Sequence, residues 1–85
     1  MARPYKVTNH ACVRMRDRAG IGRKHDIRKE FQLAMQHGDI HKIKDEEFLE
    51  YLKDKGPGVK VYNGKIFIHR SRTLITVYEI PDRFK

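Results

Sequence analysis

The sequence predicts one α+β domain, residues 1–85, in which two or three helices pack on one face of a three- to four-stranded antiparallel sheet. Apolar residues recur at helical spacing in the first half of the chain. The second half is rich in β-branched residues and contains an Asn-Gly pair between two of its apolar stretches. A chain of 85 residues has room for a single domain with a thin core.

The first helix is expected to begin at Thr8-Asn9, because either side chain can accept from free backbone N–H groups. It is expected to end at Gly20, since glycine readily adopts the conformation of a helix C-terminus. Its apolar residues have the spacing of a buried stripe: Ala11, Cys12 and Met15. Its polar residues are expected on a different face: His10, Arg14 and either Asp17 or Arg18.

A second helix is expected from His25-Asp26 to Gly38, with one apolar stripe that makes it the best-defined element. That stripe consists of Ile27, Phe31, Ala34 and Met35. Residues 40–43 are expected to form a short strand. A short third helix is expected after Asp45, whose side chain is a good cap, and Gly56-Pro57-Gly58 ends it.

The remainder of the chain predicts a sheet. Val59–Tyr62 and Lys65–His69 flank Asn63-Gly64, and this pair supplies the positive φ angles of a type I′ hairpin turn. Residues 70–72 make a second turn, and Thr73–Ile80 forms the last strand, which Pro81 stops.

The faces of the last strand follow from its alternation. If Ile75 and Val77 pack under the helices, Thr76 and Tyr78 point to the opposite side of the sheet. Leu74 is apolar on that supposedly open side, so the pattern leaves the choice of face unsettled.

The charge balance predicts a polyanionic partner. Lys and Arg number 19 against 11 Asp and Glu, a formal net charge of +8. Such an excess on a small body is most often matched by phosphate backbone, and RNA is favoured over DNA. The alternative is a soluble basic protein with no such partner. No basic segment carries a contiguous apolar face, so a membrane partner is not expected.

The expected location is the cytoplasm. The chain has no apolar run of about 18 residues, and no apolar stretch follows Met1–Tyr5, so neither a membrane span nor a signal peptide is expected. Cys12 is the single cysteine, which excludes an internal disulfide and favours a small core residue over a reactive thiol.

The chemistry-bearing residues suit phosphodiester cleavage without a metal. Histidines and the cysteine have no metal-ligand spacing, and there is no P-loop or dinucleotide fingerprint, so no metal and no cofactor are expected. Histidine can act as base or acid near neutral pH, and arginine can hold a phosphate with two donors. The candidate catalytic residues are His10, Arg14, Thr76 and Tyr78. The candidate nucleic-acid-binding residues are Arg70, Arg72, His69 and Arg18. Taken singly, each also fits an ordinary surface helix, turn or sheet position.

The segment Asn9–Arg18 reads Asn-His-Ala-Cys-Val-Arg-Met-Arg-Asp-Arg and is followed by Gly20-Ile21. It resembles an uncharacterised bacterial and phage domain family that opens with His-Ala-x-x-Arg-Met-x-x-Arg and closes on a Thr-Val-Tyr-like strand, here Leu74–Tyr78. That family looks like a relative of the small RelE- and BrnT-type toxins, whose broader group contains metal-independent ribonucleases. The resemblance implies a RelE/BrnT-like fold, with His10 and Arg14 as matched motif positions.

The first functional hypothesis is therefore a metal-independent endoribonuclease, toxin-like, with an acidic antitoxin as partner. His10 would be its base or acid, and Arg14 with Arg70 or Arg72 would bind and neutralise the phosphate. Thr76 and Tyr78 would assist. The alternative is a non-catalytic nucleic-acid-binding or host-factor-inhibiting module of a phage or bacterium. A third possibility is an inhibitor that binds an acidic protein, and salt-sensitive binding to RNA or DNA would count against it.

Overall fold

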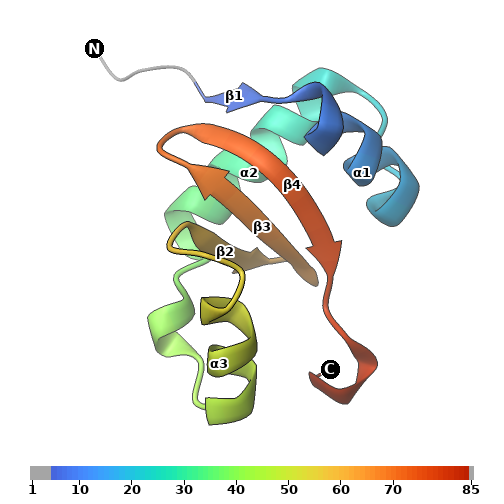
Figure 1. Cartoon of the computed structure of the whole chain (residues 1–85). Helices are drawn as coiled ribbons and strands as arrows, with labels where there is room; N and C mark the ends of the chain where they lie inside the picture. The colour runs from blue at the N-terminus through green and yellow to red at the C-terminus, as the bar shows by residue number, and fades with distance from the viewer. Residues whose placement is uncertain (1–4, 85) are drawn as a thin grey trace.

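The protein, described for residues 5–84 by a computed structural model, places three α-helices around a four-stranded sheet (Figure 1). The α+β class is confirmed. Met1–Pro4, which entered the expectation about a signal peptide, lie outside the described residues. In chain order the elements are β1 Lys6–Val7, α1 Asn9–Ala19, α2 Lys24–His37, the 3₁₀ helix η1 Ile40–Lys42, α3 Glu46–Lys53, β2 Val59–Tyr62, β3 Lys65–Arg70, β4 Thr73–Glu79 and the 3₁₀ helix η2 Asp82–Phe84.

The strands lie in the order β1-β4-β3-β2. The pairs β2–β3 and β3–β4 are antiparallel, as predicted. β1, however, pairs parallel to β4, with Lys6 opposite Thr73 and Val7 opposite Leu74, so the sheet is mixed and the purely antiparallel prediction is wrong. A strand of two residues has too little alternation to be recognised in a sequence.

The Asn-Gly hairpin is confirmed. Asn63 and Gly64 have φ angles of 51° and 76°, and both are positive, as a type I′ turn requires. The second turn also contains a left-handed residue, Ser71, with a φ of 56°.

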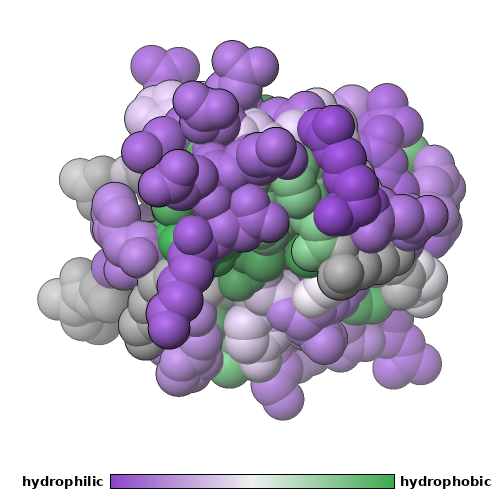
Figure 2. All heavy atoms as spheres, turned by 90° about the horizontal axis from the view of Figure 1, so that it is seen from below, coloured by the Kyte–Doolittle hydropathy of each residue, from purple (hydrophilic) through white to green (hydrophobic). Residues whose placement is uncertain are grey.

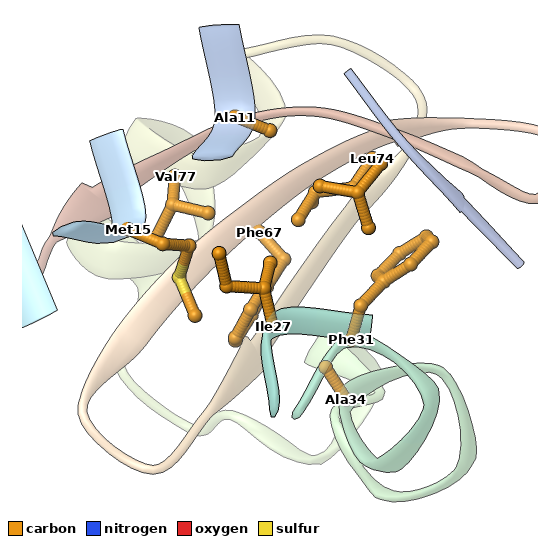
Figure 3. Close-up of a cluster of buried hydrophobic side chains, with 9 residues drawn as sticks. Ala11, Met15, Ile27, Phe31, Ala34, Phe67, Leu74 and Val77 are labelled. Carbon is orange, nitrogen blue, oxygen red and sulfur yellow. The ribbon is translucent and has the colours of Figure 1, made fainter. Parts of the chain in front are cut away.

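The helices cover both faces of the sheet. α1 and α2 bury one cluster (Figure 3), which contains Ala11, Met15, Ile27, Phe31, Ala34, Phe67, Leu74 and Val77. α3 buries a second cluster, in which Phe48 and Leu52 pack with Val59 and Ile66. Ile66 and Phe67 are neighbours on β3 and therefore point to opposite faces. The prediction of helices on one face is thus wrong for α3, because β3 is apolar on both sides and both sides need cover.

A β-bulge changes the alternation of β4. Ile68 pairs with Thr76, whereas His69 pairs with Leu74, so Ile75 is an extra residue on β4. Leu74 and Val77 therefore both reach the α1/α2 cluster, and Ile75 is left 38% exposed. The expectation that Ile75 packs under the helices is wrong, while the expectation for Val77 is confirmed.

Capping residues set the ends of the helices, largely as predicted. Thr8 Oγ1 accepts from the N–H of Ala11 at 3.1 Å, and Gly20 ends α1 with a φ of 69°. Asp45 Oδ1 accepts from the first turn of α3. Residues 40–42 form a 3₁₀ helix instead of the expected strand, because Asp39 Oδ1 accepts from a backbone N–H at 2.9 Å and closes the turn.

Candidate nucleic-acid interface

Arg18 joins the end of α1 to the exposed edge of β4. Its Nη1 donates to the carbonyl oxygen of Val77 at 2.8 Å, and its guanidinium carbon lies 4.9 Å from the centre of the Tyr78 ring. β1 ends at Val7, so within residues 5–84 no strand covers this part of β4, and its outward carbonyl needs another donor. Arg18 stands four residues after Arg14 and seven after the buried Ala11, so it lies at the margin between the polar face and the buried stripe, and its side chain is half-buried.

Lys55 brings a second cation to the same ring. Its Nζ lies 4.8 Å from the centre of the Tyr78 ring and 4.7 Å from that of Tyr51. Neither Lys55 nor Arg18 forms an ion pair with a carboxylate of residues 5–84. Tyr78 thus holds two cations whose charges the described part of the chain leaves unneutralised.

A basic stripe leads along α1 to this ring. His10, Arg14 and Arg18 are four residues apart, which places them in one row, and about 12 Å of helix separates the first from the last. The start of α1 is fixed on β4, because Thr8 N–H donates to the carbonyl of Leu74 at 3.1 Å. His10 is exposed and lies at this start, Arg14 is half-buried in the middle, and Arg18 meets the ring at the far end.

Thr76 has a different environment from the one a catalytic role implies. Its side chain is 8% exposed, and its Oγ1 is buried without a hydrogen-bond partner among the described residues. Thr76 pairs with Ile68 in the interior of the sheet. A ligand on the α1 stripe therefore has no open path to this hydroxyl.

The other predicted binding residues lie elsewhere. Arg70 and Arg72 flank the β3–β4 turn, where Arg70 is exposed and the guanidinium carbon of Arg72 lies 5.0 Å from the centre of the Tyr5 ring. His69 is half-buried on the α2 side of the sheet, with its ring 6.0 Å from that of Phe31. The structure thus joins Arg18 with Tyr78 and places His69 apart from them.

Sequence reasoning missed Lys55 and Tyr51. Lys55 comes after the last turn of α3, next to a glycine with a φ of 125°, and no periodic pattern marks it. Tyr51 lies within α3, and its place in the sequence gives no reason to group it with Lys55. The contact between Lys55 and Tyr51 depends on how the chain folds back after α3, so no signal in the sequence identifies it.

A groove on α3 carries more acidic than basic groups. It has a volume of about 770 Å³ and is lined by Glu47, Glu50 and Asp54, together with Lys53, Arg83, Tyr51 and Phe84. Figure 2, a view from below Figure 1, shows a mostly hydrophilic face with an apolar area at its centre. Three carboxylates against two cations make this groove less attractive to phosphate than the stripe on α1.

Comparison with known protein families, curated proteins and solved structures returned no match. Within residues 5–84, no three His, Cys, Asp or Glu side chains are grouped to hold a metal ion. No helix of that part of the chain combines the length and apolar character that crossing a bilayer requires. The fold and this interface define the molecule as a small α+β protein with a basic stripe that ends on an aromatic ring.

Proposed function

We propose that the protein binds single-stranded RNA along the basic stripe of α1 and the cations at its end. This surface, named the α1 strip, consists of His10, Arg14, Arg18, Tyr78 and Lys55. The observation that carries the proposal is the pair of unneutralised cations on the Tyr78 ring. Two like charges held near one ring repel each other, and a phosphate group between them removes that repulsion.

The ring explains how the cations stay in place without carboxylates. The face of an aromatic ring attracts cations, and the bond from Arg18 to the Val77 carbonyl fixes one of them further. The guanidinium keeps donors for a phosphate beyond the one that Val77 accepts, since arginine has five N–H groups. Lys55, which follows the end of α3, adds a second positive charge near the same ring.

A single strand fits this surface better than a duplex. α1 packs its buried stripe on the sheet, and Arg14 and Arg18 are half-buried at its margin, so the helix is not free to enter a major groove. Arginine planes and aromatic rings are the usual stacking partners of bases in single strands. The formal charge of +8 supplies the long-range attraction.

The enzymatic form of the proposal is a metal-independent endoribonuclease with His10 beside Arg14. Their place one helical turn apart on the basic stripe favours it. Two observations support cleavage at His10 less than they support RNA binding: Thr76 is buried, and about 12 Å of helix separates His10 from Arg18. An acidic protein partner, such as an antitoxin, would cover the same strip and compete with RNA.

The test is the affinity for a labelled single-stranded RNA in EDTA, measured by fluorescence anisotropy. Lys55→Gln and Tyr78→Ala are each expected to raise the Kd about 5- to 50-fold, the usual range for one phosphate contact or one aromatic platform. Lys24→Gln is the matched control, because it removes one exposed positive charge from the start of α2, away from Tyr78.

The salt dependence separates site binding from general attraction. Lys55→Gln should lower the slope of log Kd against log salt by about one, because one phosphate contact is lost. If Lys24→Gln and Lys55→Gln weaken binding equally, the RNA follows net charge alone and the α1 strip is not its site. Absence of any salt-sensitive binding would reject the function and point to a protein partner.

A further inference from the structure

A second cluster of titratable groups lines a groove at the outer edge of β2. The groove has a volume of about 470 Å³, within the range of small-ligand sites. Two imidazoles and two ammonium groups line it together with one carboxylate: His41, His69, Lys53, Lys60 and Asp39. We call it the histidine groove. It lies outside the α1 strip and shares no residue with it.

The hydrogen bonding of His69 fixes the state of its ring. Nδ1 lies 3.0 Å from the carbonyl oxygen of Ser71, and because a carbonyl only accepts, Nδ1 carries the proton and donates it. Burial lowers the pKa of His69 below 6.5, the Ser71 carbonyl opposes this shift, and Lys60 adds to it. The neutral ring therefore keeps its lone pair on Nε2, the form that a general base needs near neutral pH.

The start of β2 holds His69 in this position. The N–H of His69 donates to the carbonyl of Gly58 at 2.8 Å, and a Cβ on Gly58 would overlap the carbonyl oxygen of His69. The ring packs near Phe31 of α2. A base whose backbone and ring are both fixed is already oriented for a substrate.

His41 provides the second imidazole from η1. Its backbone N–H is held by Asp39 Oδ1 at 2.9 Å, and its side chain is exposed, so the ring is open to solvent and substrate. Lys53 comes from the end of α3 and Lys60 from β2, so cations stand on two separate elements of the groove. The lining thus supplies two imidazoles for proton transfer and two ammonium groups that attract a phosphate.

We propose that the histidine groove is a site for RNA phosphodiester cleavage, with His69 as base and His41 as acid. The proposal rests on the RNA binding proposed above. Nε2 of His69 removes the proton of a ribose 2′-hydroxyl, and that oxygen forms a bond to phosphorus while the bond from phosphorus to the 5′-oxygen breaks. His41 donates a proton to the leaving 5′-oxygen. Lys53 and Lys60 neutralise the charge on the phosphate, and the products are a 2′,3′-cyclic phosphate and a 5′-hydroxyl end.

The groove lies within reach of a strand held on the α1 strip. Lys53 and Pro57 line the groove, and each is two residues from Lys55, which is at most about 7 Å of chain. A strand anchored by its phosphates at Lys55 thus passes close to the entrance of the groove. Binding and cleavage are thereby assigned to different side chains, which allows them to be tested separately.

The experiment measures cleavage and binding of the same labelled single-stranded RNA in EDTA, with wild type and three variants. His69→Asn keeps an N–H donor at the Nδ1 position for the Ser71 carbonyl and removes Nε2. His41→Gln changes an exposed side chain, so folding is preserved even if His69→Asn proves unstable. His25→Asn is the matched control, an exposed histidine at the start of α2 that lines neither site.

The expected result is cleavage by wild type and His25→Asn, with cyclic phosphate ends. His69→Asn and His41→Gln should each lower the rate at least about 100-fold, the usual contribution of an acid or base, with the Kd within about two-fold. The acidic limb of the wild-type pH–rate profile should lie below pH 6.5, since that limb reports the base.

Two results would overturn the assignment. Wild type that binds RNA without cutting it, or full activity in His41→Gln, leaves RNA binding in place and rejects the histidine groove as a cleavage site. Loss of cleavage in His10→Ala with unchanged rates in both groove variants moves the chemistry to α1. Wild type that neither binds nor cuts rejects both proposals together.

Discussion

The side chain of Arg18 takes the place of a neighbouring strand for Val77. Its Nη1 donates to the Val77 carbonyl oxygen at 2.8 Å, on the edge of β4 that β1 is too short to cover. An unpaired carbonyl there would be open to another strand, so this bond also protects the edge. The same guanidinium lies on Tyr78, and a structural role and a binding role therefore meet in one residue.

Arg18→Met is expected to lower the free energy of unfolding by about 2 kcal/mol, because the carbonyl of the buried Val77 loses a charged donor. Urea denaturation followed by circular dichroism measures the change. Arg16→Met makes the same substitution on an exposed face of the same helix and should change stability by less than about 0.5 kcal/mol. Equal effects at both positions would mean that the bond to Val77 contributes nothing.

Thr8→Val should cost about 2 kcal/mol of stability, because one hydroxyl serves two partners. Thr8 Oγ1 accepts from Ala11 N–H at 3.1 Å and donates to the carbonyl of Ile75, the bulge residue, at 3.1 Å. Thr8→Ser keeps the hydroxyl and is expected to stay close to wild type. A thermal melt in which the Val and Ser variants are indistinguishable would contradict this account.

Gly58→Ala is expected to destabilise the protein by about 2 kcal/mol or more, because its Cβ would overlap the carbonyl oxygen of His69. The shift of that backbone should also change the environment of the His69 ring, which NMR of its ring protons detects. Gly22→Ala is the control, since its Cβ would meet just one atom, the Arg16 Nε at 4.0 Å. A Gly58→Ala variant as stable as Gly22→Ala would show that β2 can move away from β3 at no cost.

Thr76→Val should raise stability by about 1 kcal/mol, since it replaces a buried hydroxyl without a partner among the described residues by a methyl group of the same shape. RNA affinity is expected to stay unchanged. Thr76→Ser, which keeps the hydroxyl and loses the methyl, should be less stable than wild type. A loss of RNA binding or cleavage in Thr76→Val would restore the functional role that the sequence motif implies for this residue.

The stability of the protein should fall as the pH drops below 6.5, in part because of His69. Burial holds the folded-state pKa of His69 below its ordinary 6.5, so the unfolded chain binds a proton that the folded protein rejects. The stabilisation is complete above 6.5 and is lost as the pH falls through the folded pKa. Between about pH 7 and about pH 5, the urea midpoint of His69→Asn should change less with pH than that of wild type. Parallel curves for the two proteins would assign the decline to other groups.

The parts of the fold that local signals specify were predicted from the sequence. Thr8, Gly20 and Asp45 mark helix ends because their backbone and capping chemistry acts within a few residues. Asn63-Gly64 marks the hairpin for the same reason. The one-sided arrangement of the helices and the face of Ile75 were predicted wrongly, because a two-sided strand and a bulge depend on what packs against them.

The residues of the candidate site also fall into those that the sequence identifies and those that packing brings together. The +8 charge and the row of His10, Arg14 and Arg18 can be read from the order of residues, because charge and helical spacing depend on nothing else. Packing brings Arg18 and Lys55 to the Tyr78 ring, buries Thr76, and places His41 and His69 in one groove. Residues that far apart in the chain meet only when helices and strands pack, and their spacing along the sequence does not predict these contacts.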